Sequence, residues 1–286
     1  MMTRRLQCGS RSLDLTLPSV MGILNITPDS FSDGGDLYYD NKIDLDALLG
    51  RAQAMVDAGA LMLDVGGEST RPGAAAVTEA EEMDRVLTAV ELLVERFEVI
   101  VSVDTSTPKL MTECARLGAG FLNDIRAFRR PGALEAAAET GLPLCVMHMQ
   151  GEPCSMQLSP EYLDVIADVR HFLEERVAAC IQAGIKEERI VLDPGFGFGK
   201  TSDQNFEMLA RLGEVSFGQR PLLVGLSRKS MIATVLDRNP SERLYASVGL
   251  AMIAVERGAH ILRVHDVAAT VDALAMWRAL PRSFDR

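Results

Sequence analysis

One local pattern, repeated along the chain, limits the possible folds more than any other feature. A segment with helical spacing ends at a glycine, a short apolar run follows, and polar residues end that run. A glycine just past a helix commonly takes the left-handed conformation that terminates the helix, so each one indicates a change from helix to strand. The glycines in this position are Gly59, Gly118, Gly141, Gly184 and Gly258.

The apolar runs are hydrophobic at consecutive positions, which is typical of parallel strands buried on both faces. With three runs that lack the preceding glycine, the sequence predicts strands at 20–26, 61–67, 99–105, 120–125, 142–149, 190–195, 221–227 and 260–266. The other segments have helical spacing and are long enough for crossover connections. These predicted helices cover 44–58, 78–97, 107–117, 131–140, 160–183, 203–212, 240–257 and 268–280.

Eight strand–helix units in about 250 residues are typical of the α/β TIM (β/α)8 barrel. We therefore predict a single domain over 1–286, in which 1–18 is an N-terminal extension and 6–17 form a small hairpin over the barrel bottom. A doubly wound open sheet shows the same alternation and remains the alternative, because a strand count does not establish closure. No linker rich in Pro, Gly or Ser indicates a second domain.

Composition and charge narrow the class of protein. The net charge of −11 argues against a nucleic-acid partner, because binding a polyanion needs a basic face. The longest apolar stretch, at 248–255, is far shorter than the roughly 20 residues that span a bilayer, and residues 1–15 lack the apolar core of a signal peptide. Five scattered cysteines without a CxxC pair indicate reduced thiols. We expect a soluble cytoplasmic protein.

The segment 193–202, DPGFGFGKTS, resembles a nucleotide-binding loop but has the wrong spacing. A Walker loop would need glycine where Pro194 stands, and the dinucleotide fingerprint needs two residues between Gly197 and Gly199, where a single phenylalanine lies. We assign the lysine and threonine of this segment to a loop-to-helix transition. Asp193, a carboxylate at the end of a buried strand, is the residue that we expect to matter for function.

Polar side chains end every predicted strand. In a TIM barrel the active site lies at the carboxyl ends of the strands, so these side chains would meet at one mouth. A single aspartate there can simply cap a loop, but eight polar strand ends together indicate a site. They are Asn25, Asp64, Asp104, Asn123 with Asp124, His148, Asp193, Ser227 to Lys229, and Arg263 with His265.

The expected site combines two kinds of group. Its acceptors suit a ligand rich in N–H donors, such as the guanidine-like edge of a heterocycle, and its cations suit an anion such as phosphate. The acceptors are Asp64, Asp104, Asn123 and Asp193, and the donors or cations are Arg71, Lys229, Arg263 and His265. A ligand with a nitrogenous ring at one end and a phosphate at the other would satisfy both kinds.

Two other chemistries are disfavoured. Four histidines without an HxH or HExxH motif argue against a zinc or di-metal site, and the lack of a Gly-x-Ser-x-Gly elbow argues against a serine hydrolase. A Mg²⁺ ion held by Asn25 and by substrate phosphates would leave little trace in a sequence, so this ion remains the metal that we expect.

The motifs at the strand ends resemble those of the dihydropteroate synthase family over nearly the whole chain. We find no departure from the family pattern at any position that we expect to be functional. The motifs are MGILNITPDSFSDGG (21–35), DVGGESTRPGA (64–74), SVDTS (102–106), NDIRAF (123–128), MHMQGEP (147–153), DPGFGFGKT (193–201), GLSRKSMI (225–232) and RVHDV (263–267).

The resemblance implies a reaction. The family condenses 7,8-dihydropterin-6-ylmethyl pyrophosphate with p-aminobenzoate and releases 7,8-dihydropteroate and pyrophosphate, in an SN1-like displacement assisted by Mg²⁺. Sulfonamides would compete for the p-aminobenzoate slot. The resemblance also implies a homodimer, with helices near the C-terminal end of the barrel as the interface.

The resemblance further implies a role for each matching residue. The pterin would contact Asp64, Asp104, Asn123, Ile125, Met147, Asp193, Lys229 and Arg263, with Met147 and Arg263 on its two faces. The pyrophosphate would contact Asn25, Thr70, Arg71, Arg263 and His265, and Asn25 would ligate Mg²⁺. The p-aminobenzoate would contact Phe31, Thr70, Pro72, Phe198, Lys229 and Ser230, where Ser230 begins a helix. The residues implied in catalysis are Asp104, Lys229, Arg263, His265 and Arg71.

Two alternatives share part of this pattern. The methyltetrahydrofolate-binding barrel of corrinoid methyltransferases would keep the pterin acceptors but handles no pyrophosphate. A catalytically silent pterin-binding paralogue would keep the fold but should have lost some of the set formed by Asn25, Arg71, Lys229, Arg263 and His265. The intact set favours the synthase.

Overall fold

The computed structural model describes residues 5–27, 38–39, 42–69, 77–153 and 155–281. Its main sheet holds eight parallel strands. The first six lie side by side in chain order, and the eighth and then the seventh lie on the other side of the first. The strands are β3 (Ser19–Asn25), β6 (Met62–Gly66), β7 (Ile100–Asp104), β8 (Phe121–Asp124), β9 (Leu144–Met147), β10 (Ile190–Asp193), β11 (Leu223–Val224) and β12 (Ile261–Val264). The predicted strands are thus all present.

The two edge strands of this sheet meet and complete a barrel. Leu192 of β10 forms a parallel bridge with Leu222, and the Leu192 amide donates a hydrogen bond to the Pro221 carbonyl at 2.9 Å. The sheet is therefore the predicted TIM barrel and not the open doubly wound alternative.

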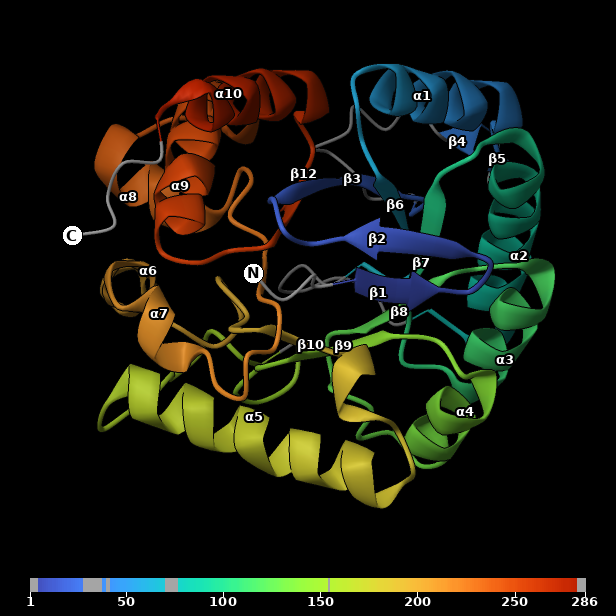
Figure 1. The fold of residues 1–286 in the computed structure, drawn as a ribbon, viewed down its shortest axis with the longest axis horizontal. Coiled ribbons are helices and arrows are strands. Elements are labelled where there is room, and N and C mark those ends of the chain that lie inside the picture. The colour runs from blue at the N-terminus through green and yellow to red at the C-terminus, as the bar shows by residue number, and fades with distance from the viewer. Residues whose placement is uncertain (1–4, 28–37, 40–41, 70–76, 154, 282–286) are drawn as a thin grey trace.

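Helices surround the barrel (Figure 1). They are α1 (Leu45–Asp57), α2 (Glu79–Arg96), α3 (Pro108–Leu117), α4 (Ala133–Thr140), α5 (Val165–Gln182), α6 (Ser202–Ala210), α7 (Leu212–Val215), α8 (Ser230–Leu236), α9 (Leu244–Glu256) and α10 (Val267–Ala279). Shorter elements are the β4–β5 pair (Tyr38–Tyr39 and Lys42–Ile43) and two 3-10 turns (Glu187–Arg189 and Pro240–Glu242). No described helix is long and apolar enough to cross a membrane.

Three predicted helices have different boundaries in the structure. The helix expected over 160–183 starts at Val165, because the Asp164 side chain accepts hydrogen bonds from the first-turn amides. The helix expected over 203–212 is divided at Arg211 into α6 and α7. The helix expected over 240–257 is a 3-10 turn followed by α9.

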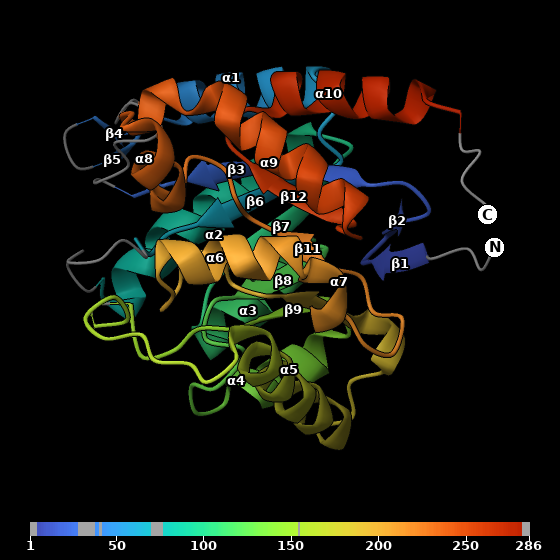
Figure 2. The same ribbon diagram turned by 90° about the vertical axis from the view of Figure 1, so that its left-hand side faces the viewer.

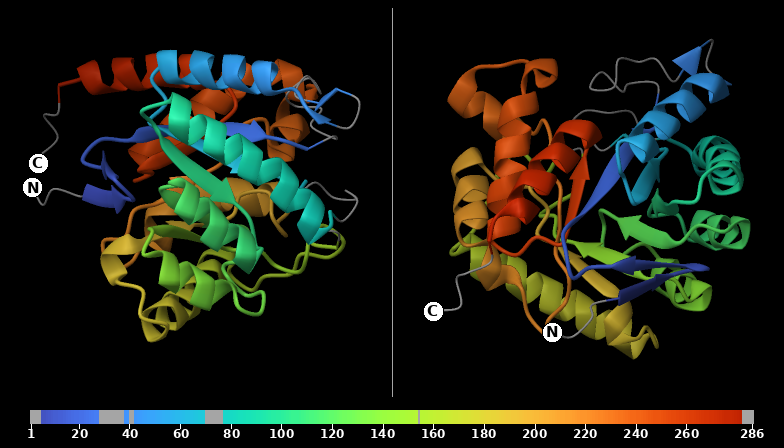
Figure 3. Two further views of the ribbon diagram at one scale, coloured as in Figure 1. Left: turned by 90° about the vertical axis from the view of Figure 1, so that its right-hand side faces the viewer. Right: turned by 45° about the horizontal axis from the view of Figure 1, so that its top comes forward.

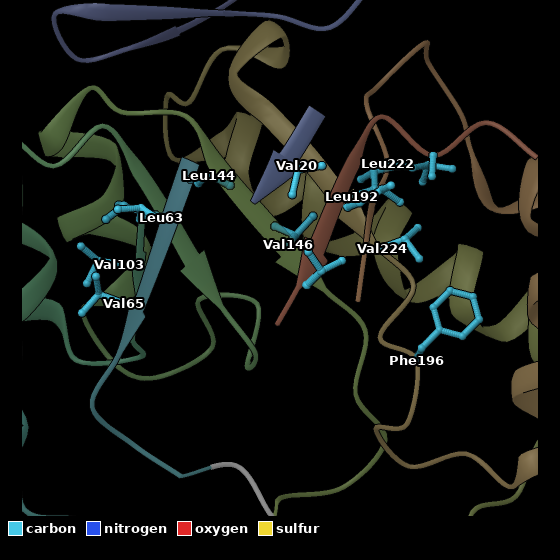
Figure 4. Close-up of a cluster of buried hydrophobic side chains, with 14 of the residues drawn as sticks. Val20, Leu63, Val65, Val103, Leu144, Val146, Leu192, Phe196, Leu222 and Val224 are labelled. Carbon is cyan, nitrogen blue, oxygen red and sulfur yellow. The ribbon is translucent and has the colours of Figure 1, made fainter. Parts of the chain in front are cut away.

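Side chains alternate between the two faces of each strand, so the barrel has two apolar regions. The outward residues pack against the helices in the larger cluster, part of which is drawn in Figure 4, with Val65 and Val103 among the labelled side chains. The inward residues at the amino ends of the strands form a second cluster. Its strand members are Met21, Met62, Ile100, Phe121, Cys145, Val191, Leu223 and Ile261.

The N-terminal hairpin covers this second cluster. Strands β1 (Arg5–Cys8) and β2 (Arg11–Asp14) pair antiparallel, and the hairpin lies at one end of the barrel (Figures 2 and 3). Leu6 and Leu13 are 3% and 2% exposed and belong to the same cluster as the inward strand residues. The predicted hairpin therefore seals the amino-terminal end, and the carboxyl-terminal mouth is left for binding.

We predict that Leu13→Ala lowers the free energy of unfolding by about 2–5 kcal/mol, because it removes a buried side chain and leaves a cavity. Urea denaturation measures this change. Ser12→Ala, at the exposed neighbouring position, is the control and should change the same quantity by less than about 0.5 kcal/mol. A similar small effect from both variants would contradict the sealing role of the hairpin.

Candidate functional site

Inside the carboxyl-terminal half of the barrel, Arg263 of β12 forms ion pairs with two aspartates from neighbouring strands. Its Nε donates to Oδ2 of Asp64 at 2.6 Å, and its Nη2 donates to Oδ2 of Asp104 at 2.9 Å. Asp64 is fully buried, and the Asp104 side chain is 13% exposed. Because buried charges are costly unless they are paired and hydrogen-bonded, these contacts hold the guanidinium in one place.

Asp64 is the deepest member of this network. Its Oδ1 accepts a hydrogen bond from Ser102 Oγ at 2.5 Å, and its Oδ2 accepts one from Asn123 Nδ2 at 3.3 Å as well as the one from Arg263. The Asn123 amide is thereby oriented, and its Oδ1 is buried without a hydrogen-bond partner in the described part of the chain. A buried acceptor of this kind is a position where a ligand can donate a hydrogen bond.

Burial and neighbouring charges shift the pKa values of Arg263 and Asp104. Burial opposes the charge on Arg263, but the carboxylates of Asp64 and Asp104 raise its pKa above the usual value. Burial raises the pKa of Asp104 to about 8, while the Arg263 guanidinium acts in the opposite direction. Arg263 is therefore protonated at neutral pH, whereas ionisation of Asp104 depends on the Arg263 guanidinium beside it.

A pocket opens above this network at the mouth of the barrel. Its walls are partly apolar, because Ile125 and Met147 pack with two further methionines, Met149 and Met156, and with Phe198. The residues that line it are Asp104, Asn123, Ile125, Met147, Asp193, Gly195, Phe196, Phe198, Gly225, Lys229 and Arg263. A flat ring with polar edges suits such a pocket.

Lys229 lines the same pocket and is the residue that precedes α8. Its Nζ is 4.2 Å from the centroid of the Phe198 ring, a cation–π contact. Burial lowers the pKa of Lys229 to about 8, with Arg263 acting in the same direction and Asp193 and Asp104 against it. Lys229 can therefore act as a cation below pH 8.

Asp193 ends β10 beside this lysine. Its Oδ1 accepts a hydrogen bond from the Gly195 amide at 2.7 Å, and burial raises the pKa of its carboxyl above the usual value. The following loop has positive φ at Gly195, where a side chain would collide with the His148 carbonyl. Glycine is thus required for the loop to turn across the mouth.

His265 directly follows β12 and contacts Ser227, which lies in the segment after β11. Its Nδ1 lies 3.0 Å from Ser227 Oγ, and its backbone amide donates to the same oxygen at 3.2 Å. Burial and the nearby cations, Arg263 first, lower the pKa of His265 to about 3. The imidazole is therefore uncharged at neutral pH and offers a hydrogen bond, whereas the sequence also allowed it as a cation.

Two of the polar strand ends do not face the mouth, contrary to the sequence prediction. Asp124 is fully buried on the outer face of β8, where it accepts hydrogen bonds from Ser106 Oγ and from the amides of Arg126 and Phe128. His148 is also buried, against Phe172 of α5. Each follows an inward residue on its strand, so the twofold alternation of a strand turns it outward.

A charged cluster outside the barrel ties three loops together. The Arg126 guanidinium makes two hydrogen bonds to Glu68, both at 2.9 Å, one to Ser106 Oγ at 3.0 Å, and a longer contact with Glu152 at 3.4 Å. Glu68 follows β6, Arg126 follows β8 and Glu152 follows β9. The cluster fixes the described beginning of the loop after β6.

Other predicted site residues lie elsewhere or outside the described residues. Asn25 is the last residue of β3, which pairs with β6 and β12, and Ser230 is the exposed first residue of α8. Neither of these two, nor His265 or Asp64, lines the pocket. The expected contributions of Phe31, Thr70, Arg71 and Pro72 fall outside the described residues.

Sequence reasoning missed several residues that shape the site. Ser102 carries a usable signal, because it lies two positions before Asp104 on β7 and therefore faces the same interior. Met149 and Met156 carry no comparable signal. Among the described residues no group of three or more His, Cys, Asp and Glu side chains has the arrangement of a metal site.

A (β/α)8 barrel with charged and polar groups gathered at its carboxyl-terminal mouth belongs structurally to the barrel enzymes. The family model described as "Pterin binding enzyme" matches residues 21–265. Dihydropteroate synthase of Escherichia coli is 56% identical over 268 residues, which cover 94% of this chain and 93% of that protein.

Two solved structures agree with this relationship. The Yersinia pestis dihydropteroate synthase in complex with a sulfonamide drug has a TM-score of 0.92 and 52% identity, covering 96% of this chain and 98% of that one. The Xanthomonas albilineans enzyme in complex with 7,8-dihydropteroate has a TM-score of 0.86 and 43% identity, covering 97% and 100%. The chain belongs to the dihydropteroate synthase family of pterin-binding enzymes.

We predict that Asp64→Asn lowers the free energy of unfolding by about 3–5 kcal/mol, because it removes one charge of a buried ion pair and leaves Arg263 partly uncompensated. Chemical denaturation at neutral pH measures the change. The control is Glu113→Gln in the exposed pair with Arg116, which should cost less than about 0.5 kcal/mol. Equal effects in both variants would mean that the buried network adds nothing to stability.

Proposed function

We propose that this protein joins 7,8-dihydropterin-6-ylmethyl pyrophosphate to p-aminobenzoate, forming 7,8-dihydropteroate and pyrophosphate. The observation that carries the proposal is the buried Asn123 Oδ1, which lacks a described partner and lies in a pocket with two aspartates, Asp104 and Asp193. These acceptors match the N–H groups of a pterin edge. The cations of Arg263 and Lys229 line the same pocket and match the anionic parts of the two substrates.

The pterin would enter the pocket with its donor edge toward the deep acceptors. Met147 and Arg263 are lining residues that can cover the two faces of the ring, because a guanidinium plane stacks on π systems. Asp64 would act from below, since it orients both Asn123 and Arg263 without reaching the pocket. Ile125 would add an apolar edge contact.

The pyrophosphate would lie toward β3 and β12, where His265 offers a neutral N–H group and Arg263 a charge. Thr70 and Arg71 would join it from the loop after β6. Asn25 fits a Mg²⁺ ion in one respect, since its amide oxygen is the hard type of ligand that Mg²⁺ prefers, with phosphate oxygens and water as the others. When bound there, the ion would neutralise part of the pyrophosphate charge.

The p-aminobenzoate would occupy the outer part of the mouth. Phe198 would form one wall, and Lys229, already over the Phe198 ring, would contact the carboxylate or the pterin carbonyl. Ser230, the first residue of α8, would lie near the carboxylate. Phe31, Thr70 and Pro72 would complete the slot. Sulfonamides would compete for this position.

The proposed reaction needs a site that stabilises both the departing pyrophosphate anion and a cation that develops on the pterin. The carbon–oxygen bond to pyrophosphate breaks, and its electron pair leaves with the pyrophosphate. The cation that remains is delocalised into the pterin ring, the amine lone pair then forms the carbon–nitrogen bond, and the nitrogen loses a proton to solvent. Asp104 would balance a cation that develops on the ring, and the neighbouring Arg263 guanidinium favours the charged form of this carboxyl.

We also propose a homodimer that forms through the helices α8, α9 and α10, which lie together on one side of the barrel (Figure 1). These helices carry large apolar side chains that are exposed in the monomer. They are Val235, Leu236, Tyr245, Ile253 and Met276. Sedimentation of the purified protein tests this proposal, and a monomer at all micromolar concentrations would contradict it.

The activity is tested with the purified protein, the dihydropterin pyrophosphate, p-aminobenzoate and Mg²⁺. We expect equal amounts of pyrophosphate and dihydropteroate, and a lower rate when a chelator replaces Mg²⁺. Folded protein that binds pterin but forms no product would support the silent paralogue instead. Calorimetric titration with the pterin substrate alone separates these outcomes.

We predict that kcat/KM for p-aminobenzoate falls as pH rises through about 8, because Lys229 loses its proton there. Lys229→Arg keeps a cation at higher pH, so its falling limb should move upward even if the maximum rate is lower. The limb at lower pH should stay where it is in the wild type. A falling limb at the same pH in both proteins would exclude Lys229 as its source.

A further inference from the structure

Lys200 is buried although the reaction assigns it no role. It follows the phenylalanine-containing loop at 194–199 and is 2% exposed. The sequence placed it with Thr201 in the loop-to-helix transition. Thr201 does cap α6, through reciprocal hydrogen bonds with Gln204, but the Lys200 side chain turns inward beneath the loop.

The three protons of the Lys200 ammonium have three acceptors. Nζ lies 2.8 Å from Nδ1 of His148, 2.9 Å from the Gly195 carbonyl and 3.0 Å from the Phe198 carbonyl. Burial lowers the pKa of Lys200 to about 7, with Asp193 acting against this shift and Lys229 in the same direction. Burial and Lys200 lower the pKa of His148 well below its usual value, so the neutral ring can accept at Nδ1.

This arrangement fixes the turn that carries Phe198. Gly195 and Phe198 bound the turn, and both of their carbonyl oxygens point at the same ammonium. Without the ammonium, two carbonyl oxygens that point at one place inside the protein would each lose a charged donor. The Phe198 amide closes the turn by donating to the Gly195 carbonyl at 3.1 Å.

The turn has supports on its outer side that do not depend on Lys200. Gln157 donates to the Gly197 carbonyl at 2.7 Å, Asn205 accepts from the Gly197 amide at 2.7 Å, and Tyr162 donates to the Gly199 carbonyl at 2.6 Å. Loss of Lys200 should therefore loosen the inner side of the turn, where Phe198 faces the pocket, without removing the loop from the fold.

We propose that Lys200 is a positioning residue for the second substrate, acting through the backbone carbonyls that place the Phe198 ring against Lys229. This inference rests on the proposed function, which puts Phe198 and Lys229 at the p-aminobenzoate slot. Asp193 belongs to β10 and keeps its own hydrogen bond to the Gly195 amide, so the pterin side should depend less on Lys200.

The test compares Lys200→Met, which keeps an unbranched apolar stem of similar length and removes the ammonium, with the wild-type enzyme. We expect the KM for p-aminobenzoate to rise about tenfold or more, since small displacements of a positioned group are costly. The KM for the pterin pyrophosphate and kcat should change less than about threefold. Lys200→Gln retains N–H donors and should give an intermediate KM, and it serves as the second variant if the methionine variant does not fold.

A matched control lies before β10, the strand that leads into the loop held by Lys200. Arg189 precedes β10 and binds the Leu142 carbonyl through its guanidinium, so it is also a partly buried cation that holds a backbone carbonyl. Arg189→Met should lower the melting temperature without changing the KM for p-aminobenzoate. A similar rise in KM for both variants would mean a general loss of stability and would overturn the proposal.

Hydrogen exchange gives a readout that does not depend on the reaction. In Lys200→Met the amides of residues 195–198 should exchange faster, and in Arg189→Met they should not. Unchanged exchange and unchanged KM in the Lys200 variants would refute the positioning role while the wild type still forms dihydropteroate. If the wild type formed no dihydropteroate, the proposed function would be wrong. Faster exchange in Lys200→Met would still show that the ammonium stabilises this turn.

Discussion

The ion pairs of Arg263 with Asp64 and Asp104 are the interaction on which the rest of the site depends. A guanidinium inside a barrel is strongly disfavoured unless carboxylates surround it, and those carboxylates are disfavoured without the guanidinium. Strands β6, β7 and β12 must therefore place complementary groups at matching heights inside the barrel. Ser102 and Asn123 donate the remaining hydrogen bonds to Asp64. The polar residues inside the barrel thus offset one another's cost of burial.

The amino-terminal end of the barrel contributes to stability, and the carboxyl-terminal end holds the candidate site. At the amino end the hairpin residues Leu6 and Leu13 close an apolar cluster. At the carboxyl end the same inward positions hold charges that cost folding free energy and offer binding. Because one continuous strand such as β7 contributes Ile100 to the first region and Asp104 to the second, the apolar end can stabilise the strand that carries the charged group.

The sequence predicted the architecture well because the strands repeat a simple pattern, and it predicted Asp104, Asn123, Asp193, Lys229 and Arg263 as neighbours because strand ends of a barrel converge. It failed where orientation mattered. Asp124 and His148 follow inward residues and therefore face outward, which a strict twofold count would have shown. The role of Lys200 was not predicted for another reason, since two of its three acceptors are carbonyls whose directions depend on turn geometry and not on residue type.

The same network also explains why Arg263 is suited to a flat ring. Its Nε and Nη2 are bonded to two different carboxylates, so the plane of the guanidinium is fixed before any ligand arrives. A plane that is already fixed loses little side-chain entropy when a ring stacks on it. If stacking instead required Arg263 to leave Asp104, that carboxylate would be freed beside the ring, where burial already raises its pKa to about 8. In the proposed reaction, a cation that develops on the pterin ring would then be the partner of the Asp104 carboxylate.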